Sequence, residues 1–420
     1  MKSLVAYLYI TFLLGLGLSG CNSVSNSKIS DKATMIEQLA FCGQPEGHER
    51  YDVFLLDFST NKWVNLTEEY VSKIDDVFGN SIGCYEFMRP YGVSGLEWSP
   101  KGDLLIVNAG EPYFRIPYVL EVSSNGEIQK IVEQWPPPLD DWPYYERPLH
   151  YSWSPNGSQI AFDALNETGG YSNLFVGNVS EWRTSSPDTQ LIQMTEEYRD
   201  FPGIVYAPSW SPDGNKIAVS LAGPASGIII VSMGDGKSIY VSDDTSEKLS
   251  SMEINLLLDL WLDFPSMKPS WSPDGSEIVF LAATTPKERT TLFKVDEHGQ
   301  NLTVLIPEGV YNPVFSPNGQ QIAYIEYAGK LNPKTVGRVV LVDGDGKNRQ
   351  VIATIKTEEV KSLLTKYYIR GLSWSPDGKW LIFTSNASGN FQLYLLSADG
   401  NVFEQVMDFP GDAVYPQWRP

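Results

Sequence analysis

Short apolar runs separated by turn-forming residues occupy most of this chain. Runs of this length, rich in Val, Ile, Leu and aromatic residues, predict β-strands. One set comprises LLIV (104–107), IAF (160–162), IAVS (217–220), IVFL (278–281), IAYI (322–325) and LIFT (381–384). A second set follows it, comprising YVLEV (118–122), LFVGNV (174–179), IIIV (228–231), LFKV (292–295), VVLV (339–342) and LYLL (393–396). Because the two sets alternate regularly, the sequence predicts a repeat architecture.

A short motif precedes each run of the first set: an aromatic residue, Ser, Pro, then Asp, Asn or Lys, and Gly. Such a segment suits a type I turn, because Pro fixes φ at the second position and Gly fits the fourth. Full copies begin at Trp98, Trp153, Trp210, Trp271, Phe315 and Trp374, and a remnant surrounds Trp418. We expect these aromatic side chains to be buried at equivalent positions between neighbouring repeats.

Each repeat contains four predicted strands. Most runs of the second set end in an Asn-Gly or Asp-Gly pair, which is a strong hairpin signal. A fourth run then follows, as in LIQMT (191–195) and NLTVLI (301–306). Four-stranded antiparallel meanders are the blades of a β-propeller. We therefore predict an all-β propeller domain over residues 36–420.

The two chain ends supply the strands of one more blade. Leu39–Phe41, Val53–Phe58 and Lys62–Thr67 predict second, third and fourth strands with no turn motif before them. Val414–Trp418 predicts a first strand. A shared blade of this kind closes the ring and removes sheet edges that favour aggregation. The prediction is seven blades, with six as the alternative if the terminal strands do not pair.

The Trp-Ser-Pro-Asp-Gly turn followed by an apolar strand resembles the repeat of TolB-type, WD-repeat-like propellers. The resemblance covers residues 36–420 and implies the fold. It also implies that TolB itself carries an N-terminal α/β domain before six blades. Since no segment of domain size precedes the first strand here, we expect this chain not to be TolB, and TolB's partner-binding role is not carried over.

The first twenty residues have the pattern of a signal peptide, with one early Lys, an apolar stretch and small residues before Cys21. Leu18–Cys21 resembles the lipobox of bacterial lipoproteins, which implies that Cys21 becomes the lipidated N-terminus. Ordinary cleavage that leaves an unmodified cysteine is the alternative. Residues 21–35 then form the lipidated cysteine and a polar tether. These features predict an extracytoplasmic, lipid-anchored protein of the bacterial cell envelope, in the periplasm or at the cell surface.

Two cysteines remain after Cys21, namely Cys42 and Cys84. Outside the cytoplasm, two thiols favour a disulfide over a metal site. Both lie on the same side of the predicted disc, so we expect a bridge between them, with two free thiols as the alternative. We expect the mature protein to be a monomer.

The chain carries 31 basic and 51 acidic residues, for a formal net charge of -20. So acidic a protein lacks the positive patch that nucleic acid requires, and it would be repelled by anionic lipid headgroups. We therefore expect no nucleic-acid partner and membrane contact through the lipid anchor only. Basic proteins and cations are more suitable partners, although solubility alone also explains the charge.

One face of the predicted disc carries long, irregular connections, and function in repeat proteins tends to lie on such a face. Residues 135–151 are rich in aromatic and charged side chains, and residues 68–91 add more. These side chains suit a protein interface or a glycan site, or they pack the loops onto the disc. The binding candidates are Trp142, Tyr144, Tyr145, Arg147, His150 and Arg89.

The insertion 243–268 has apolar residues at helical spacing and predicts a helix across this face. No catalytic motif and no phosphate-binding glycine loop occurs, and the three histidines lie far apart in the predicted map. We therefore expect no catalytic residues, no cofactor and no metal. The leading interpretation is a non-enzymatic module that binds a protein or peptide. The alternative is a carbohydrate-binding or carbohydrate-active propeller, such as a lyase.

Overall fold

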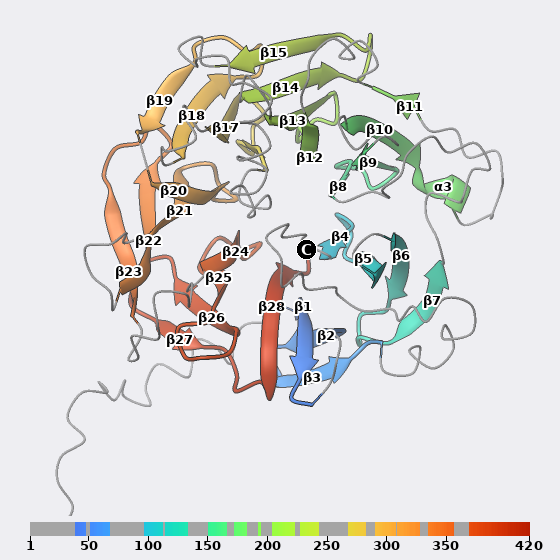
Figure 1. Cartoon of the computed structure of the whole chain (residues 1–420), viewed down its shortest axis with the longest axis vertical. Helices are drawn as coiled ribbons and strands as arrows, with labels where there is room; N and C mark the ends of the chain where they lie inside the picture. Colours follow the sequence, from blue (N-terminus) through green and yellow to red (C-terminus); the bar gives the residue numbers. More distant parts are fainter. Residues whose placement is uncertain are drawn as a thin grey trace, which may run out of the picture.

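The computed structural model describes residues 38–47, 51–67, 96–111, 114–132, 150–165, 172–182, 192–194, 204–222, 227–242, 268–282, 290–307, 309–327, 335–356 and 369–420. Within these ranges, the strands form seven four-stranded antiparallel sheets. The sheets are arranged as blades around a central axis (Figure 1). The predicted seven-bladed, all-β propeller is therefore confirmed.

The first three blades follow one another along the chain. Blade 1 contains β4 (Leu96–Trp98), β5 (Leu104–Glu111), β6 (Phe114–Val122) and β7 (Ile128–Val132). Blade 2 contains β8 (Tyr151–Trp153), β9 (Gln159–Leu165), β10 (Ser172–Asn178), helix α3 (Val179–Trp182) and β11 (Ile192–Gln193). Blade 3 contains β12 (Ile204–Trp210), β13 (Lys216–Ala222), β14 (Gly227–Ser232) and β15 (Ser238–Ser242).

The remaining blades complete the ring. Blade 4 contains β16 (Ser270–Trp271), β17 (Glu277–Ala282), β18 (Thr291–Asp296) and β19 (Thr303–Ile306). Blade 5 contains β20 (Val310–Phe315), β21 (Gln321–Tyr327), β22 (Thr335–Asp343) and β23 (Gln350–Lys356). Blade 6 contains β24 (Ile369–Trp374), β25 (Trp380–Ser385), β26 (Gln392–Ser397) and β27 (Phe403–Gln405). The closing blade contains β28 (Gly411–Trp418), β1 (Gln38–Pro45), β2 (Asp52–Asp57) and β3 (Lys62–Asn65).

The first strand of every blade lies nearest the axis and the fourth lies at the rim (Figure 1). Around the axis, the inner strands contact one another in the order β28, β4, β8, β12, β16, β20 and β24. Each inner strand begins at a connection between blades and ends at the repeat's turn motif. One face of the disc therefore carries the turn motifs and the hairpins between third and fourth strands. We call it the short-turn face, and the opposite face the long-loop face.

The closing blade joins the two ends of the chain. Strand β28 pairs antiparallel with β1, with Leu39 opposite Trp418 and Cys42 opposite Val414. Strand β1 then pairs with β2, and β2 with β3. The predicted pairing of the terminal strands is therefore confirmed.

The core lies between blades. Seven apolar clusters are described, and each joins the facing surfaces of neighbouring blades; the cluster between blades 4 and 5 also includes Tyr206 and Ala207 of blade 3. One such cluster packs Ile106 of blade 1 against Trp153 and Phe162 of blade 2. All seven repeat aromatics are buried, as predicted: Trp98, Trp153, Trp210, Trp271, Phe315, Trp374 and Trp418.

Several repeat tryptophans also bond the preceding blade. The Trp153 indole N–H donates to the carbonyl of Glu97 at 3.3 Å, and the Trp271 N–H donates to the carbonyl of Ser209 at 3.0 Å. Trp374 and Trp418 repeat the contact. In every case the acceptor is the residue before the preceding blade's own repeat aromatic. The motif therefore defines the angle between blades as well as the turn.

Two local features depart from the predicted repeat. Blade 2 has a short helix after its third strand, and its fourth strand is reduced to the two residues of β11. Inner strands β12, β20, β24 and β28 carry bulges that shift their register. Positive φ angles fall three residues before the repeat aromatic, at Ala207, Asn312, Gly371 and Tyr415. These bulges bend the inner strands close to the axis.

Candidate functional site

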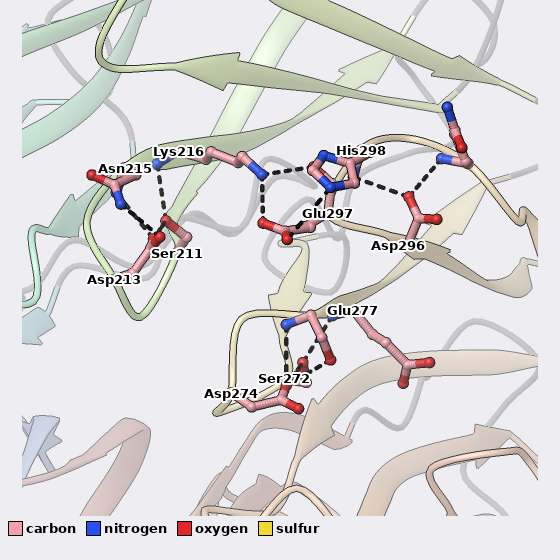
Figure 2. A network of polar contacts seen from close by, with 12 residues as sticks. Ser211, Asp213, Asn215, Lys216, Ser272, Asp274, Glu277, Asp296, Glu297 and His298 are labelled. Carbon is pink, nitrogen blue, oxygen red and sulfur yellow. Dashed lines mark hydrogen bonds and ion pairs between the residues drawn. The ribbon is translucent and has the colours of Figure 1, made fainter.

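The turns of the short-turn face are held by a repeated set of internal hydrogen bonds. In blade 3, the Gly214 N–H donates to the Ser211 carbonyl at 2.9 Å, which closes the predicted type I turn. The Ser211 hydroxyl donates to Asp213 and accepts the Lys216 N–H (Figure 2). This hydroxyl contact is the largest cause that lowers the pKa of Asp213, and Ser272 acts in the same way on Asp274.

The same turns pack against one another around the ring. A Cβ added at Gly214 would lie 3.6 Å from Pro155 of the preceding turn, and one at Gly275 would lie 3.6 Å from Pro212. The Gly157 and Gly378 positions face Pro100 and Pro317 in the same way. The Ser-Pro-Asp-Gly segment is thus a structural element, with its Gly placed against the Pro of the neighbouring blade.

An ion pair links two of these blades on the same face. The Lys216 ammonium of blade 3 lies 2.5 Å from the Glu297 carboxylate in the β18–β19 hairpin of blade 4 (Figure 2). His298 of the same hairpin lies 3.6 Å from Glu297. Polar groups of this face therefore bond one another within and between blades, which is a structural role.

A second set of polar side chains lies around the axis, near the ends of the inner strands that meet the long-loop face. We call it the axial cluster, and it comprises Glu97, His150, Tyr151, Asp163, Tyr206 and Lys268. Blades 1 to 4 all contribute to it. His150 directly precedes β8, as the sequence predicted, and Lys268 lies two residues before β16. Both stand three residues before a repeat aromatic, which is the position of the bulge in blades 3, 5 and 6.

His150 is held by a carboxylate of the next strand. Its ring Nδ1 lies 3.0 and 3.2 Å from the two oxygens of Asp163, and its backbone N–H donates to the same carboxylate at 3.0 Å. Both side chains are buried, with exposed fractions of 8% and 2%. An ionised Asp163 favours the proton on Nδ1, which leaves a lone pair on Nε2. Within the described ranges, this buried Nε2 has no hydrogen-bond partner.

Lys268 crosses to two other blades. Its ammonium donates to both Glu97 oxygens, at 3.2 and 3.4 Å, and to the Tyr151 carbonyl at 3.2 Å. Lys268 precedes β16 of blade 4, whereas Glu97 and Tyr151 belong to blades 1 and 2. The contact therefore joins blades that are not adjacent to blade 4 in the ring. Burial raises the pKa of Glu97, and the Lys268 charge opposes this effect. Although protein surrounds the pair, 38% of the Lys268 side chain and 26% of the Glu97 side chain remain exposed.

Tyr206 borders the cluster on the blade 3 side. Its ring centroid lies 6.2 Å from that of His150. Burial raises the pKa of Tyr206, the Ser220 contact lowers it, and the Asp163 charge raises it further. The phenol is therefore neutral at physiological pH. The cluster as a whole contains two carboxylates, one ammonium and one imidazole with an available lone pair.

The structure describes only part of the site predicted from the sequence. His150 belongs to the axial cluster and is buried. The other binding candidates lie outside the described residues: Arg89, Trp142, Tyr144, Tyr145 and Arg147. Residues 243–267, the predicted helix, lie outside them as well.

The cysteine predictions have a similar outcome. Cys42 forms a disulfide bond. Its predicted partner, Cys84, lies outside the described residues, so the pairing stays a prediction. Cys21 also lies outside them. Within the described ranges, no helix is long and apolar enough to cross a bilayer.

Glu97, Asp163 and Lys268 were not predicted as site residues. For Glu97 and Lys268, comparison of equivalent positions in the repeats gives an indication. One residue before the aromatic, the chain has Glu97, Ser152, Ser209, Ser270, Val314, Ser373 and Gln417, so Glu97 alone is charged. Three residues before it, Lys268 and His150 differ from the small or uncharged residues of the other described blades.

The chemistry of the axial cluster is that of hydrogen bonding and charge recognition. The described residues contain no group of three His, Cys, Asp or Glu side chains placed to hold a metal ion. His150 and Asp163 form a base with a fixed tautomer, but the described residues bring no nucleophile to Nε2. The cluster is therefore best suited to accept hydrogen bonds from a ligand.

Known proteins resemble this chain in sequence and in fold. A family model described as the TolB beta propeller domain matches residues 146–420. The uncharacterised peptidase YuxL of Bacillus subtilis is 29% identical over a segment covering 29% of this chain and 22% of YuxL. The chain thus matches less than a quarter of that relative's length.

Two solved structures share the fold. A Bacteroides uniformis protein proposed to be a 6-phosphogluconolactonase has a TM-score of 0.53 at 13% identity, covering 91% of this chain and 100% of that one. A prolyl endopeptidase has a TM-score of 0.53 at 14% identity, covering 90% of this chain and 51% of that one. At these identities the likeness shows the fold alone. Because the family model covers well over half of the chain, and the turn motif recurs in six blades and as a remnant in the closing one, this chain belongs to the TolB beta propeller domain family.

Proposed function

We propose that this chain is a lipid-anchored propeller of the bacterial cell envelope that binds a protein or peptide on its long-loop face. The observation that carries this proposal is the contrast between the two ends of the axis. On the short-turn face, turn carboxylates bond to hydroxyls and N–H groups of their own turns. At the other end, the axial cluster holds the imidazole Nε2 of His150, one of five buried side-chain atoms that have no partner in the described residues. Buried polar groups normally have partners, so such a group suits a ligand-binding site.

The sequence of the long-loop face supports the same proposal. Residues 135–151 combine aromatic side chains with Arg147 and several carboxylates. Trp, Tyr and Arg are the residues that most often dominate binding energy at protein interfaces. His150 and Tyr151, the last two residues of this segment, both belong to the axial cluster.

The direct test is capture of partners by the full-length protein from envelope extracts, with variants on both faces. Trp142→Ala and Tyr145→Ala should weaken binding of the captured partner by more than about 1 kcal/mol, or roughly fivefold. Asp235→Ala and Asp399→Ala are the matched controls, because both lie in hairpins of the short-turn face. Equal losses from both faces would contradict the proposal.

Two further variants test the alternative. Turnover of envelope glycans, abolished by His150→Gln or Glu97→Gln, would favour a carbohydrate-active propeller instead. The anchor has its own test: acyl labelling of wild type should be lost in Cys21→Ser, and the variant should be released from the membrane fraction.

A further inference from the structure

We propose that the axial cluster recognises a cationic group of the partner, an ammonium or a guanidinium, and that Lys268 occupies the place of this group in the free protein. The inference deepens the proposed function and rests on it for the identity of the partner. It adds the chemical class of the group that enters the site. It also gives Lys268 the role of an internal competitor.

The first argument is the coordination of the Lys268 ammonium. Its three acceptors come from Glu97 and from the Tyr151 carbonyl, which belong to two other blades. An ammonium has three N–H donors, and three acceptors converge on this one. The inner strands therefore form an ammonium site independently of the strand that carries Lys268.

The second argument is that Lys268 is able to leave. With 38% of its side chain exposed, its ammonium regains water when it withdraws from the pair. Ion pairs with this degree of exposure contribute little to stability. Exchange of one cation for another at Glu97 should therefore change the stability of the fold only slightly.

The third argument is the balance of charge and hydrogen bonds. The cluster contains the carboxylates of Glu97 and Asp163 and one ammonium, that of Lys268, which pairs with Glu97, while Asp163 contacts His150. The Nε2 lone pair of His150 is an acceptor without a donor among the described residues. The phenol of Tyr206 adds no charge, because its pKa is raised by burial. A ligand that brings positive charge and several N–H groups supplies what the cluster lacks.

The charge of the whole chain acts in the same direction. A net charge of -20 attracts basic partners and repels acidic ones over distances near the Debye length. The opposite assignment, in which Lys268 binds an anion of the partner, conflicts with the Glu97 carboxylate that pairs with Lys268. The two assignments predict opposite effects of removing Lys268, which makes them separable.

The experiment titrates the full-length protein with small probes and follows the His150 imidazole by NMR. The cationic probes are the N-acetyl methylamides of lysine and arginine. The neutral and anionic comparisons are the corresponding derivatives of citrulline and glutamate. We expect the cationic probes alone to shift the His150 signals. Because no partner protein is required, failure here is distinguishable from failure of the capture experiment.

Variants determine whether the cluster binds a cation or an anion. Lys268→Met removes the competitor and should tighten the cationic probes by about tenfold, whereas Glu97→Gln should weaken them by a similar factor. Lys216→Met is the control, because it removes a paired lysine on the short-turn face, and it should leave probe affinity unchanged. Thermal melts verify that each variant is folded. Three results would each overturn the proposal. They are weaker binding of the cationic probes to folded Lys268→Met, a preference for the anionic probe, and no binding of any probe to this variant.

Discussion

The guanidinium of Arg419 lies over the indole of Trp98, with its Cζ atom 4.9 Å from the ring centroid. These residues belong to the closing blade and to blade 1, so the contact spans the place where the ring closes. The C-terminus lies beside β4 in the same region (Figure 1). Arg419 also donates to the Gly102 and Val122 carbonyls of blade 1 and to the Gln38 side chain of β1. This single side chain therefore joins the two ends of the ring.

Arg419→Ala should lower the free energy of unfolding by about 2–3 kcal/mol, because hydrogen bonds to charged groups are among the stronger ones and their carbonyl partners would lose a donor. Urea unfolding followed by tryptophan fluorescence measures the change. Arg338→Ala is the control. Its partner is Glu326 and 43% of its side chain is exposed, so a loss of about 0–1 kcal/mol is expected. Equal losses in the two variants would show that Arg419 has no special role in closure.

Loss of the pairing between the terminal strands should have a larger effect on stability. Deleting residues 414–420 removes half of the residue pairs between β28 and β1, together with the Arg419 contacts. The exposed edge of β1 should then promote aggregation, and unfolding should lose cooperativity. Light scattering and thermal melts measure these effects. Deletion of residues 22–34, within the predicted tether, should leave the melting temperature nearly unchanged. A monomeric truncation with unaltered melting would contradict closure by β28.

A pair of Trp→Phe variants separates packing from hydrogen bonding between blades. Trp153 and Trp210 are both buried, but only the Trp153 indole N–H has an acceptor, the Glu97 carbonyl. Both changes remove the same ring volume, and blade 5 carries Phe315 at this position naturally. Trp153→Phe should therefore cost about 1 kcal/mol more than Trp210→Phe in urea unfolding. Identical costs would mean that the indole bond contributes nothing measurable.

The fold was predictable because its determinants are local and repeated. A turn of five residues specifies both a hairpin and, through its aromatic residue, a contact with the preceding blade. Even the closure followed from strands left without a turn motif. The axial cluster was not predictable in this way. Lys268 and Glu97 are 171 residues apart, and only the ring brings them together. Asp163 occupies an ordinary strand position, and nothing local in the sequence indicates its contact with His150.

Acid should destabilise the protein through its turn carboxylates. Hydrogen bonds from Ser211 and Ser272 are the largest cause of the lowered pKa values of Asp213 and Asp274, whose ordinary value is 3.8. A carboxyl group whose pKa is lower in the folded state stabilises the fold above its ordinary pKa. That contribution is lost as pH falls through the lowered value. Stability should therefore decrease below about pH 4, the ordinary range of Asp.

The double variant Asp213→Asn/Asp274→Asn tests this effect. Asparagine keeps the side-chain acceptor, as Asn156 and Asn318 do in blades 2 and 5, but it has no charge to lose. The variant should be slightly less stable than wild type at pH 7, and the difference should be smaller at about pH 3, below the ordinary Asp pKa. Urea unfolding at both pH values gives the comparison. Glu127→Gln is the control, since it removes a carboxylate without changing either turn. If the double variant differs from wild type equally at both pH values, the turn charges do not cause the acid sensitivity.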